Sequence, residues 1–166
     1  MPLSLYQKGR FLSGLFGATA YPAIPGTLYL FASTAPWATS TDAQILAAEP
    51  TVTTGGYLRP SVTNNGTDFA AVSVGAFVGS ASSTNLQAGP GPTGVLSWPA
   101  STGSGWTSAG SFLVTVGWAD GATPGAGNII WCGTPVNASG NPLSLQVNQA
   151  GITIYLAAGG FSTLLL

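Results

Sequence analysis

The sequence predicts a mainly β protein, a single antiparallel β-sandwich of jelly-roll or immunoglobulin-like type with a short N-terminal helix. Three observations predict this fold. Runs of β-branched and aromatic residues recur at intervals of about 8–12 residues, Gly, Pro and Asn turns separate them, and helical periodicity is confined to the start of the chain. The 166 residues suit one domain, without an internal repeat or composition shift to divide it.

The N-terminal segment, residues 3–16, carries the helical pattern. Its apolar face consists of Leu5, Leu12, Leu15 and Phe16. Ser4 is a candidate N-cap, whereas Gly9 and Gly14 weaken the helix, so docking must stabilise it. Prolines and a glycine within residues 21–26 end it.

The remaining elements follow from short apolar runs and turn residues. Strands are predicted at residues 27–32, 69–78, 95–98, 111–118, 128–133, 143–147 and 152–156, with a further short strand after Arg59. A helical turn over 42–48 would be capped by Thr41 or Asp42, and residues 80–94 are predicted to be a loop. We therefore expect a helix and linker arm over 1–26, the β-sandwich over 27–158 and an apolar C-terminal tail over 159–166.

Charge is scarce throughout the chain. Three basic and four acidic residues give a net charge of −1, there is no histidine, and 45% of the residues are hydrophobic. A free soluble domain usually carries about a quarter of its residues as charges. This composition indicates a subunit that is packed against neighbours in a permanent assembly.

Missing residue types exclude several functions. Without histidine, neither a Ser-His-Asp nor a Cys-His system can form within the chain, and Cys132, the only thiol, is expected to be a buried apolar residue. We expect no metal and no cofactor. The only cations, Lys8, Arg10 and Arg59, are too few to bind nucleic acid or an anionic membrane surface.

The best enzymatic alternative is a pair of carboxylates, as in glycosidases. Asp42 fits a helix cap, Asp120 precedes a glycine in a turn, and Asp68 starts a strand, while Glu49 completes the set. Because supporting acid–base residues are missing, we expect the protein not to be an enzyme.

Tryptophans offer a second alternative, a carbohydrate-binding module. Trp118 and Trp131 lie within predicted strands, where core packing is their ordinary role. Trp37 and Trp106 lie in predicted loops and are the two we expect to be exposed. Packing at a protein interface is the favoured interpretation of these exposed rings.

Both ends of the chain are apolar and could contact other subunits. The tail, residues 159–166, either folds back on its own core or inserts into a neighbour. Arg59, a lone cation in a neutral segment, should find a carboxylate or carbonyl partner on its own chain or a neighbour's. The candidate interface residues are Leu5, Leu12, Phe16, Trp37, Arg59, Trp106, Phe161, Leu164, Leu165 and Leu166.

Targeting signals are weak. Lys8 and Arg10 precede a short apolar region, residues 11–17, and then Ala-Thr-Ala at 18–20, which together resemble a signal peptide. The apolar region is short and contains glycine, so we expect the segment to be retained. No apolar run has the length of a transmembrane helix.

Several motifs, in order, resemble a family of small tailed-bacteriophage virion proteins. Residues 27–30 (TLYL) and 55–59 (GGYLR) are similar to its "LYVAL" and "GGYAR" segments. Residues 95–99 (VLSWP), Trp106, residues 127–131 (GNIIW) and 151–156 (GITIYL) follow its "ITFP", "W", "GNLLW" and "LTITL" segments. The likeness covers most of the chain but departs between residues 120 and 127, where the family has a "GIFDA" type of strand end.

Members of this family are usually labelled tail fibre proteins, and similar small sandwiches serve as capsid decoration or cement proteins. The resemblance implies a non-enzymatic virion protein, made in the host cytoplasm without a cleaved signal peptide. We favour a capsid decoration protein whose partners are copies of itself and the major capsid protein. The alternative is a tail fibre or tail-appendage subunit contacting tail proteins, and only this alternative implies a host-surface glycan.

Overall fold

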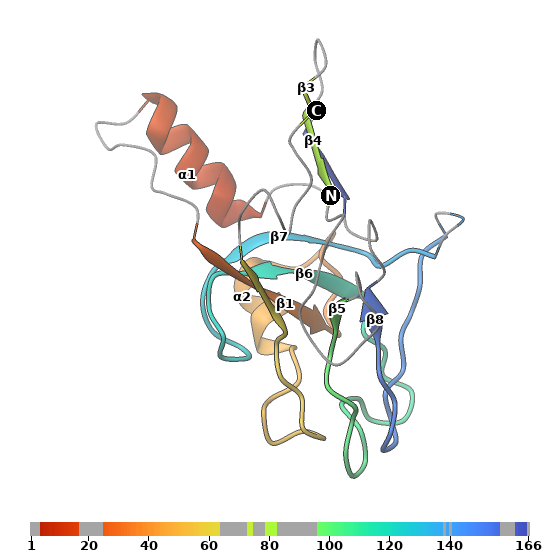
Figure 1. Cartoon of the computed structure of the whole chain (residues 1–166). Coiled ribbons are helices and arrows are strands. Elements are labelled where there is room, and N and C mark those ends of the chain that lie inside the picture. The colour runs from red at the N-terminus through yellow and green to blue at the C-terminus, as the bar shows by residue number, and fades with distance from the viewer. Residues whose placement is uncertain are drawn as a thin grey trace.

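The computed structural model describes residues 4–16, 25–63, 73–74, 79–82, 96–137, 139, 141–156 and 162–165, and its architecture is mainly β (Figure 1). The elements are α1 (Leu5–Phe16), β1 (Thr27–Ser33), α2 (Asp42–Ala47), β2 (Ser61–Thr63), β3 (Ser73–Val74), β4 (Gly79–Ser82), β5 (Leu96–Ser97), β6 (Thr115–Ala119), β7 (Ile129–Gly133), β8 (Tyr155–Leu156) and β9 (Ser162–Leu165). The antiparallel, mainly β character predicted from the sequence is confirmed.

A four-stranded antiparallel sheet with the order β2-β1-β6-β7 forms the centre of the fold. Strand β1 pairs with β6 over five residues, from Tyr29 opposite Ala119 to Ser33 opposite Thr115. Two smaller sheets have the orders β3-β4-β9 and β5-β8. The central strands β1 and β6 therefore connect segments that lie far apart in the sequence.

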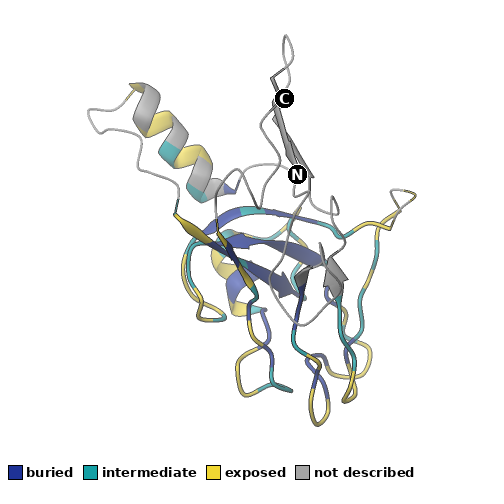
Figure 2. Cartoon of the chain, viewed as in Figure 1, coloured by how far each residue is buried: buried dark blue, intermediate teal, exposed yellow. Residues whose placement is uncertain are grey.

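Alternation along β1 places apolar side chains on both faces of the sheet. Leu28, Leu30 and Ala32 belong to a larger core that includes Trp98, Trp118 and Val147. Phe31 points to the other face and packs with Ile45 and Leu46 of α2. Figure 2 shows the resulting buried centre with exposed loops around it.

Strand β7 contributes to both cores through an irregularity in its pairing. Trp118 pairs with Trp131 but Ala119 pairs with Ile129, so Ile130 is an extra residue in the ladder. Such a bulge turns neighbouring side chains to one face. Accordingly, Ile130 and Trp131 both join the larger core, whereas Ile129 packs with Phe31 on the other face.

The local patterns predicted the helices correctly. Helix α1 occupies the expected segment, and α2 begins after Thr41, whose side chain accepts a hydrogen bond from the Gln44 amide while Gln44 bonds back to the Thr41 amide. This reciprocal capping box satisfies two otherwise free helix donors. The prediction that Thr41 or Asp42 caps this helical turn is confirmed, with Thr41 as the cap.

Some strand predictions were wrong in extent. Residues 143–147 form no strand, because Leu145 makes only an isolated bridge to Leu113. Part of the predicted 80–94 loop is strand β4, which pairs with β9. Of the predicted 69–78 strand, β3 lies within the described residues, and residues 69–72 and 75–78 lie outside them.

Candidate functional site

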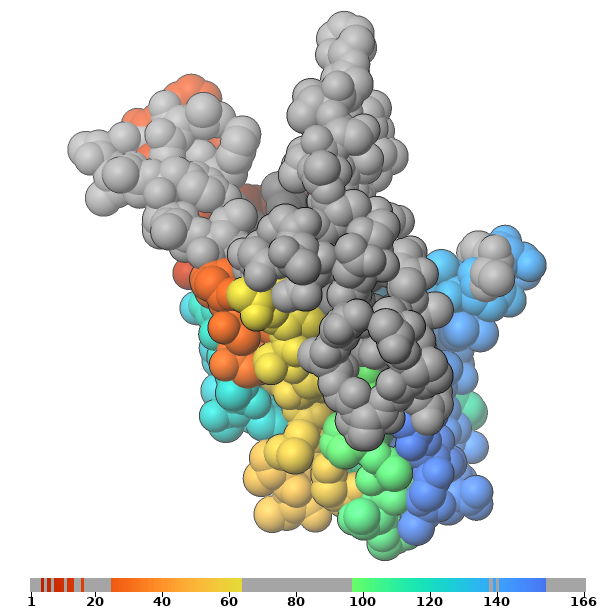
Figure 3. Space-filling model, in the orientation of Figure 1, coloured from red at the N-terminus to blue at the C-terminus, as the bar shows by residue number. Residues whose placement is uncertain are grey.

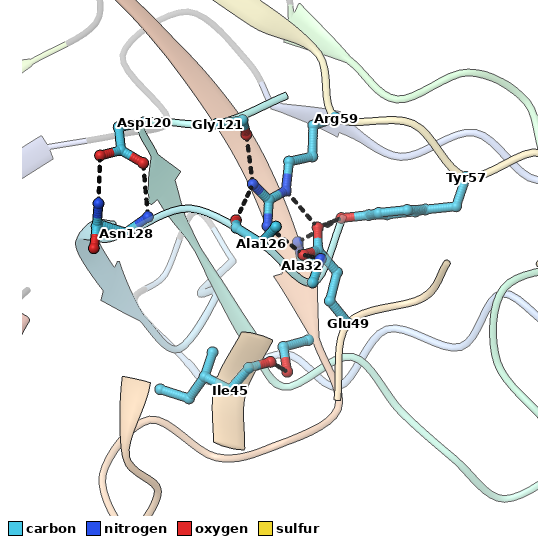
Figure 4. A network of polar contacts seen from close by, with 11 residues as sticks. Ala32, Ile45, Glu49, Tyr57, Arg59, Asp120, Gly121, Ala126 and Asn128 are labelled. Atoms are coloured by element: carbon cyan, nitrogen blue, oxygen red, sulfur yellow. Dashed lines mark hydrogen bonds and ion pairs between the residues drawn. The ribbon is translucent and has the colours of Figure 1, made fainter. Parts of the chain in front are cut away.

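A buried ion pair lies where the end of α2 meets the segment before β2 (Figure 4). Glu49 follows Ala48, the C-cap of α2, and its backbone amide donates to the Leu46 carbonyl at 3.2 Å. Arg59 Nε donates to Glu49 Oε1 at 2.8 Å, and Arg59 Nη2 donates to Oε2. Both side chains are 0% exposed. This two-pronged pairing matches the planar guanidinium to the carboxylate.

Two further donors complete the shell of the Glu49 carboxylate. The Tyr57 hydroxyl donates to Oε1 at 2.7 Å, and the Gly125 amide donates to Oε2 at 2.8 Å. Each oxygen therefore accepts two hydrogen bonds. A buried charge is tolerated when it is paired and hydrogen-bonded in this way.

The third nitrogen of Arg59 reaches the connection between β6 and β7. Nη1 donates to the Gly121 carbonyl and, at 3.1 Å, to the Ala126 carbonyl. The guanidinium carbon also lies 5.8 Å from the centre of the Phe31 ring. Arg59 thus fixes the loop from β6 to β7 against β1 and the end of α2.

Tyr57 links the Glu49 network to the central strand β1 by hydrogen bonds. Its hydroxyl accepts a hydrogen bond from the Ala32 amide at 2.9 Å while donating to Glu49. Burial, followed by the negative charge of Glu49, raises the pKa of Tyr57 well above its ordinary value of 10.0. The phenol therefore stays protonated and remains a hydrogen-bond donor at neutral pH.

The same loop from β6 to β7 is closed by Asp120. Its two carboxylate oxygens accept hydrogen bonds from the Asn128 backbone amide at 2.6 Å and from the Asn128 side chain at 2.8 Å. Gly127 has a φ of +84°, and a Cβ there would clash with the Asp120 carboxylate. The carboxylates of Glu49 and Asp120 are thus occupied by structural contacts.

Helix α1 is fastened at its first turn. The Ser4 hydroxyl donates to the Ile129 carbonyl of β7, and the Tyr6 amide donates to the Asp42 carboxylate at 3.1 Å. Farther along, Leu12 is 54% exposed and Phe16 is 83% exposed. Four residues apart, they share one helix face. Figure 2 shows α1 extending away from the sheet.

A groove opens near the loops after α2 and before β6. Its cavity volume is about 270 Å³, and it is lined by residues from the segments 47–54 and 106–111 and by Thr34. Six of the lining residues carry hydroxyl groups: Thr34, Thr51, Thr54, Thr107, Ser108 and Ser111. The groove is therefore polar without an exposed charge, because Glu49 below it is fully buried.

The predicted interface residues differ in their exposure and in the contacts that they make. Arg59 has found both a carboxylate and carbonyl partners on its own chain, as predicted. Leu12 and Phe16 are exposed. Leu164 and Leu165 lie in β9, which pairs with β4. The side chain of Leu5, and the whole of Phe161 and Leu166, lie outside the described residues.

The prediction that Trp106 is exposed was wrong. Its side chain is 3% exposed, its ring lies edge-on to Tyr57 at 5.4 Å, and its indole nitrogen donates to the Gly55 carbonyl at 3.0 Å. Trp37 is half-buried, and its indole nitrogen donates to Thr134 at 3.0 Å. The two rings therefore form no exposed stacking platform.

Cys132 is buried at 4% exposure, as predicted. Burial, and then the charge of Asp42, raise the pKa of its thiol from 9.0 to about 11. The thiol is consequently protonated at neutral pH, which suits a small apolar side chain in the core.

Within the described residues, no group of three or more Cys, Asp or Glu side chains is placed to hold a metal ion. No helix in that part of the chain is long and apolar enough to cross a membrane. Searches against protein-family models and curated proteins find no match to the chain.

Sequence reasoning assigned no role to Glu49. A signal was nevertheless available, because a lone buried arginine requires a carboxylate and the chain has only four. Asp42, Asp68 and Asp120 already had local roles in a helix start, a strand start and a turn, so elimination would have favoured Glu49. The partnership with Tyr57 and Gly125 had no such signal.

Proposed function

We propose that the chain is a non-enzymatic structural subunit of a tailed-bacteriophage virion. In this role it decorates and cements the capsid by contacting copies of itself and the major capsid protein. The observation that carries the proposal is the apolar surface of α1, where Leu12 and Phe16 are exposed on a helix whose first turn is fastened by Ser4 and Tyr6. Exposed apolar surface on an anchored arm is typical of a contact between subunits.

The charge distribution supports the same proposal. Of the seven charged residues, Glu49 and Arg59 neutralise each other in the interior. Few charges then remain to keep separate copies apart in solution. Apolar contacts of this kind hold in high salt, whereas exposed ion pairs weaken.

A β-sandwich is the finer architecture that we propose for the body. Its support is the larger core, in which Leu30 and Trp118 of the central sheet pack with Trp98, Val147 and Ile154 from the segments around β5 and β8. Apolar residues of two such layers facing each other are the basis of sandwich folds.

The chemistry of the buried network supports a non-enzymatic role. Glu49 has both oxygens occupied and no exposed side-chain surface, and Tyr57 is held protonated. A general acid or base needs access to a substrate proton. The network is therefore best interpreted as a structural fastening.

The second candidate is a tail fibre or tail-appendage subunit. The similarity of residues 27–30, 55–59 and 127–131 to proteins usually labelled tail fibre proteins favours it. The two candidates differ in symmetry, because a fibre subunit forms a compact trimer in solution, whereas a cement protein completes its contacts on the shell.

Light scattering of the purified chain across a range of salt tests the proposal. We expect a self-association that salt does not weaken, and we expect the double variant Leu12→Ser/Phe16→Ser to shift the mass toward the monomer. Val136→Ser is the matched control, since Val136 is also 54% exposed but lies outside α1.

A trimer would favour the fibre candidate. A wild-type monomer at every salt concentration, indistinguishable from the double variant, would contradict self-association through α1. Dissociation by salt would contradict the apolar basis of the contact.

A further inference from the structure

The hydroxyl-lined groove lies outside α1, the helix through which we propose the assembly contact. We propose that it binds a neutral oligosaccharide. Its lining offers Thr51, Thr54, Ser108 and Ser111 hydroxyls around a cavity of about 270 Å³. The inference goes beyond the proposed virion role, because it assigns a ligand to a surface that the contact through α1 does not use.

The charge of the lining selects the class of ligand. Glu49 is the charged residue among the lining side chains, and Arg59 neutralises it beneath the surface. A charged ligand would find no exposed counter-charge in the groove and would lose hydration on entering it. A neutral polyhydroxylated ligand can exchange hydrogen bonds with hydroxyl groups, each of which donates and accepts.

Hydrogen bonds between neighbouring hydroxyl groups restrict their positions. Thr51 Oγ1 lies 3.0 Å from Thr53 Oγ1 and 2.9 Å from Thr54 Oγ1, and Ser108 Oγ donates to Ser111 Oγ at 3.1 Å. Each hydroxyl retains further hydrogen-bonding capacity beyond these contacts. Groups that are already oriented lose less conformational entropy when a ligand binds.

The backbone beneath these loops is also fixed. The Gly55 carbonyl accepts from the Thr102 amide at 2.8 Å and from the Trp106 indole at 3.0 Å. Gly55 and Gly105 have φ of +57° and +81°, and a Cβ at Gly55 would clash with the Gly105 carbonyl. Glycine permits both the left-handed backbone and the close approach. The loops therefore give the groove a fixed base, and the loops over residues 50–57 and 98–105 lie at the lower end of Figures 1 and 3.

Trp106 contributes through its position rather than by stacking. It lines the groove, but its ring is 3% exposed and packs edge-on against Tyr57. Recognition is thus expected to depend on hydrogen bonds to sugar hydroxyls, with Ala47, Ala48 and Pro50 as the small apolar part of the lining.

Amide chemical shifts of the whole chain, titrated with maltohexaose, mannohexaose and chitohexaose, test the proposal, with hexagalacturonate as the charged control. We expect at least one neutral hexasaccharide to shift the amides of Thr51, Ser108 and Ser111, and the charged one to have no effect there. No shift with any neutral probe up to about 10 mM, or shifts confined to another surface, would overturn it.

Two substitutions locate the binding. Ser108→Trp should fill the groove and weaken binding by about tenfold or more, while Ser104→Trp, also exposed but outside the lining, should change it by less than about twofold. Thr51→Ala removes one hydroxyl without adding bulk and should weaken binding several-fold. Unchanged affinity in both groove variants would overturn the proposal, whatever the oligomeric state of the chain.

Discussion

The interior around Glu49 and Arg59 and the surface of α1 reverse the usual distribution of side chains. In most proteins charges face water and large apolar residues are buried. Here Glu49 and Arg59 are 0% exposed, whereas Phe16 is 83% exposed. The comparison indicates that the two regions have separate roles, since the buried charges fix one arrangement of loops and the exposed apolar residues remain available for contact.

The largest expected effect comes from breaking the buried ion pair. Arg59→Met leaves the Glu49 carboxylate buried without its counter-charge and should lower the free energy of unfolding by about 3–5 kcal/mol. Lys8→Met, at an exposed cation of α1, should change it by less than about 0.5 kcal/mol. Urea unfolding followed by circular dichroism measures both.

The double variant Glu49→Leu/Arg59→Met sharpens this result. Removing both charges should recover much of the stability lost in Arg59→Met, because no unpaired charge remains. An Arg59→Met protein that unfolds like the wild type would show that the pair does not fasten the loops.

Tyr57→Phe should have the next largest effect. It removes the hydroxyl that donates to Glu49 and accepts from the Ala32 amide, and so deprives both buried groups of a partner. We expect a loss of about 1–3 kcal/mol in the free energy of unfolding, measured in the same urea experiment. If Tyr57→Phe left the free energy of unfolding unchanged, a water molecule would have to replace the phenol hydroxyl at this position.

Alkaline pH should weaken the interior. The pKa values of Cys132 and Tyr57 are raised in the folded protein, so the unfolded chain releases these protons first and stability falls as pH rises. For Cys132 the loss should extend from about pH 9 to about pH 11. Cys132→Ala should delay its onset, as measured by urea unfolding at a series of pH values; an unchanged onset would contradict the assignment.

The smallest effect on stability is expected at the exposed face of α1. Leu12→Ser and Phe16→Ser should each change the free energy of unfolding by less than about 0.5 kcal/mol, because both side chains remain largely in contact with water in the folded protein. Leu30→Ala in β1, which is 0% exposed, should cost about 2–5 kcal/mol. Calorimetry at a concentration that keeps the chain monomeric distinguishes these cases, and a large loss at Phe16 would show that α1 is packed in solution.

Local patterns predicted the parts of the fold that local chemistry determines. The strand predicted over residues 27–32, the apolar run of β7 and the cap at Thr41 each depend on neighbours in the sequence, and each was found. Arg59 was predicted to seek a carboxylate or carbonyl because a cation in a neutral segment needs a partner. The identity of that partner depended on the tertiary fold.

Trp106 and residues 143–147 show why other predictions were wrong. Glycine and serine around Trp106 indicate a loop, but its burial is set by Tyr57 and by Gly55, 51 residues away in the sequence. Residues 143–147 have an apolar pattern suited to a strand, yet only Leu145 bridges Leu113. Whether such a run becomes a strand depends on which backbone lies beside it.

The pairing of β1 with β6 also has a kinetic consequence. The first strand of the sheet is synthesised long before the partner that covers most of its length, and the first turn of α1 is fastened still later, when Ser4 meets Ile129 across 125 residues. Folds dominated by such distant contacts form slowly, on a scale of about milliseconds to seconds. A nascent chain that has not yet released β6 from the ribosome therefore holds the apolar residues of β1 without their main partner, and chains truncated before β6 should aggregate rather than fold.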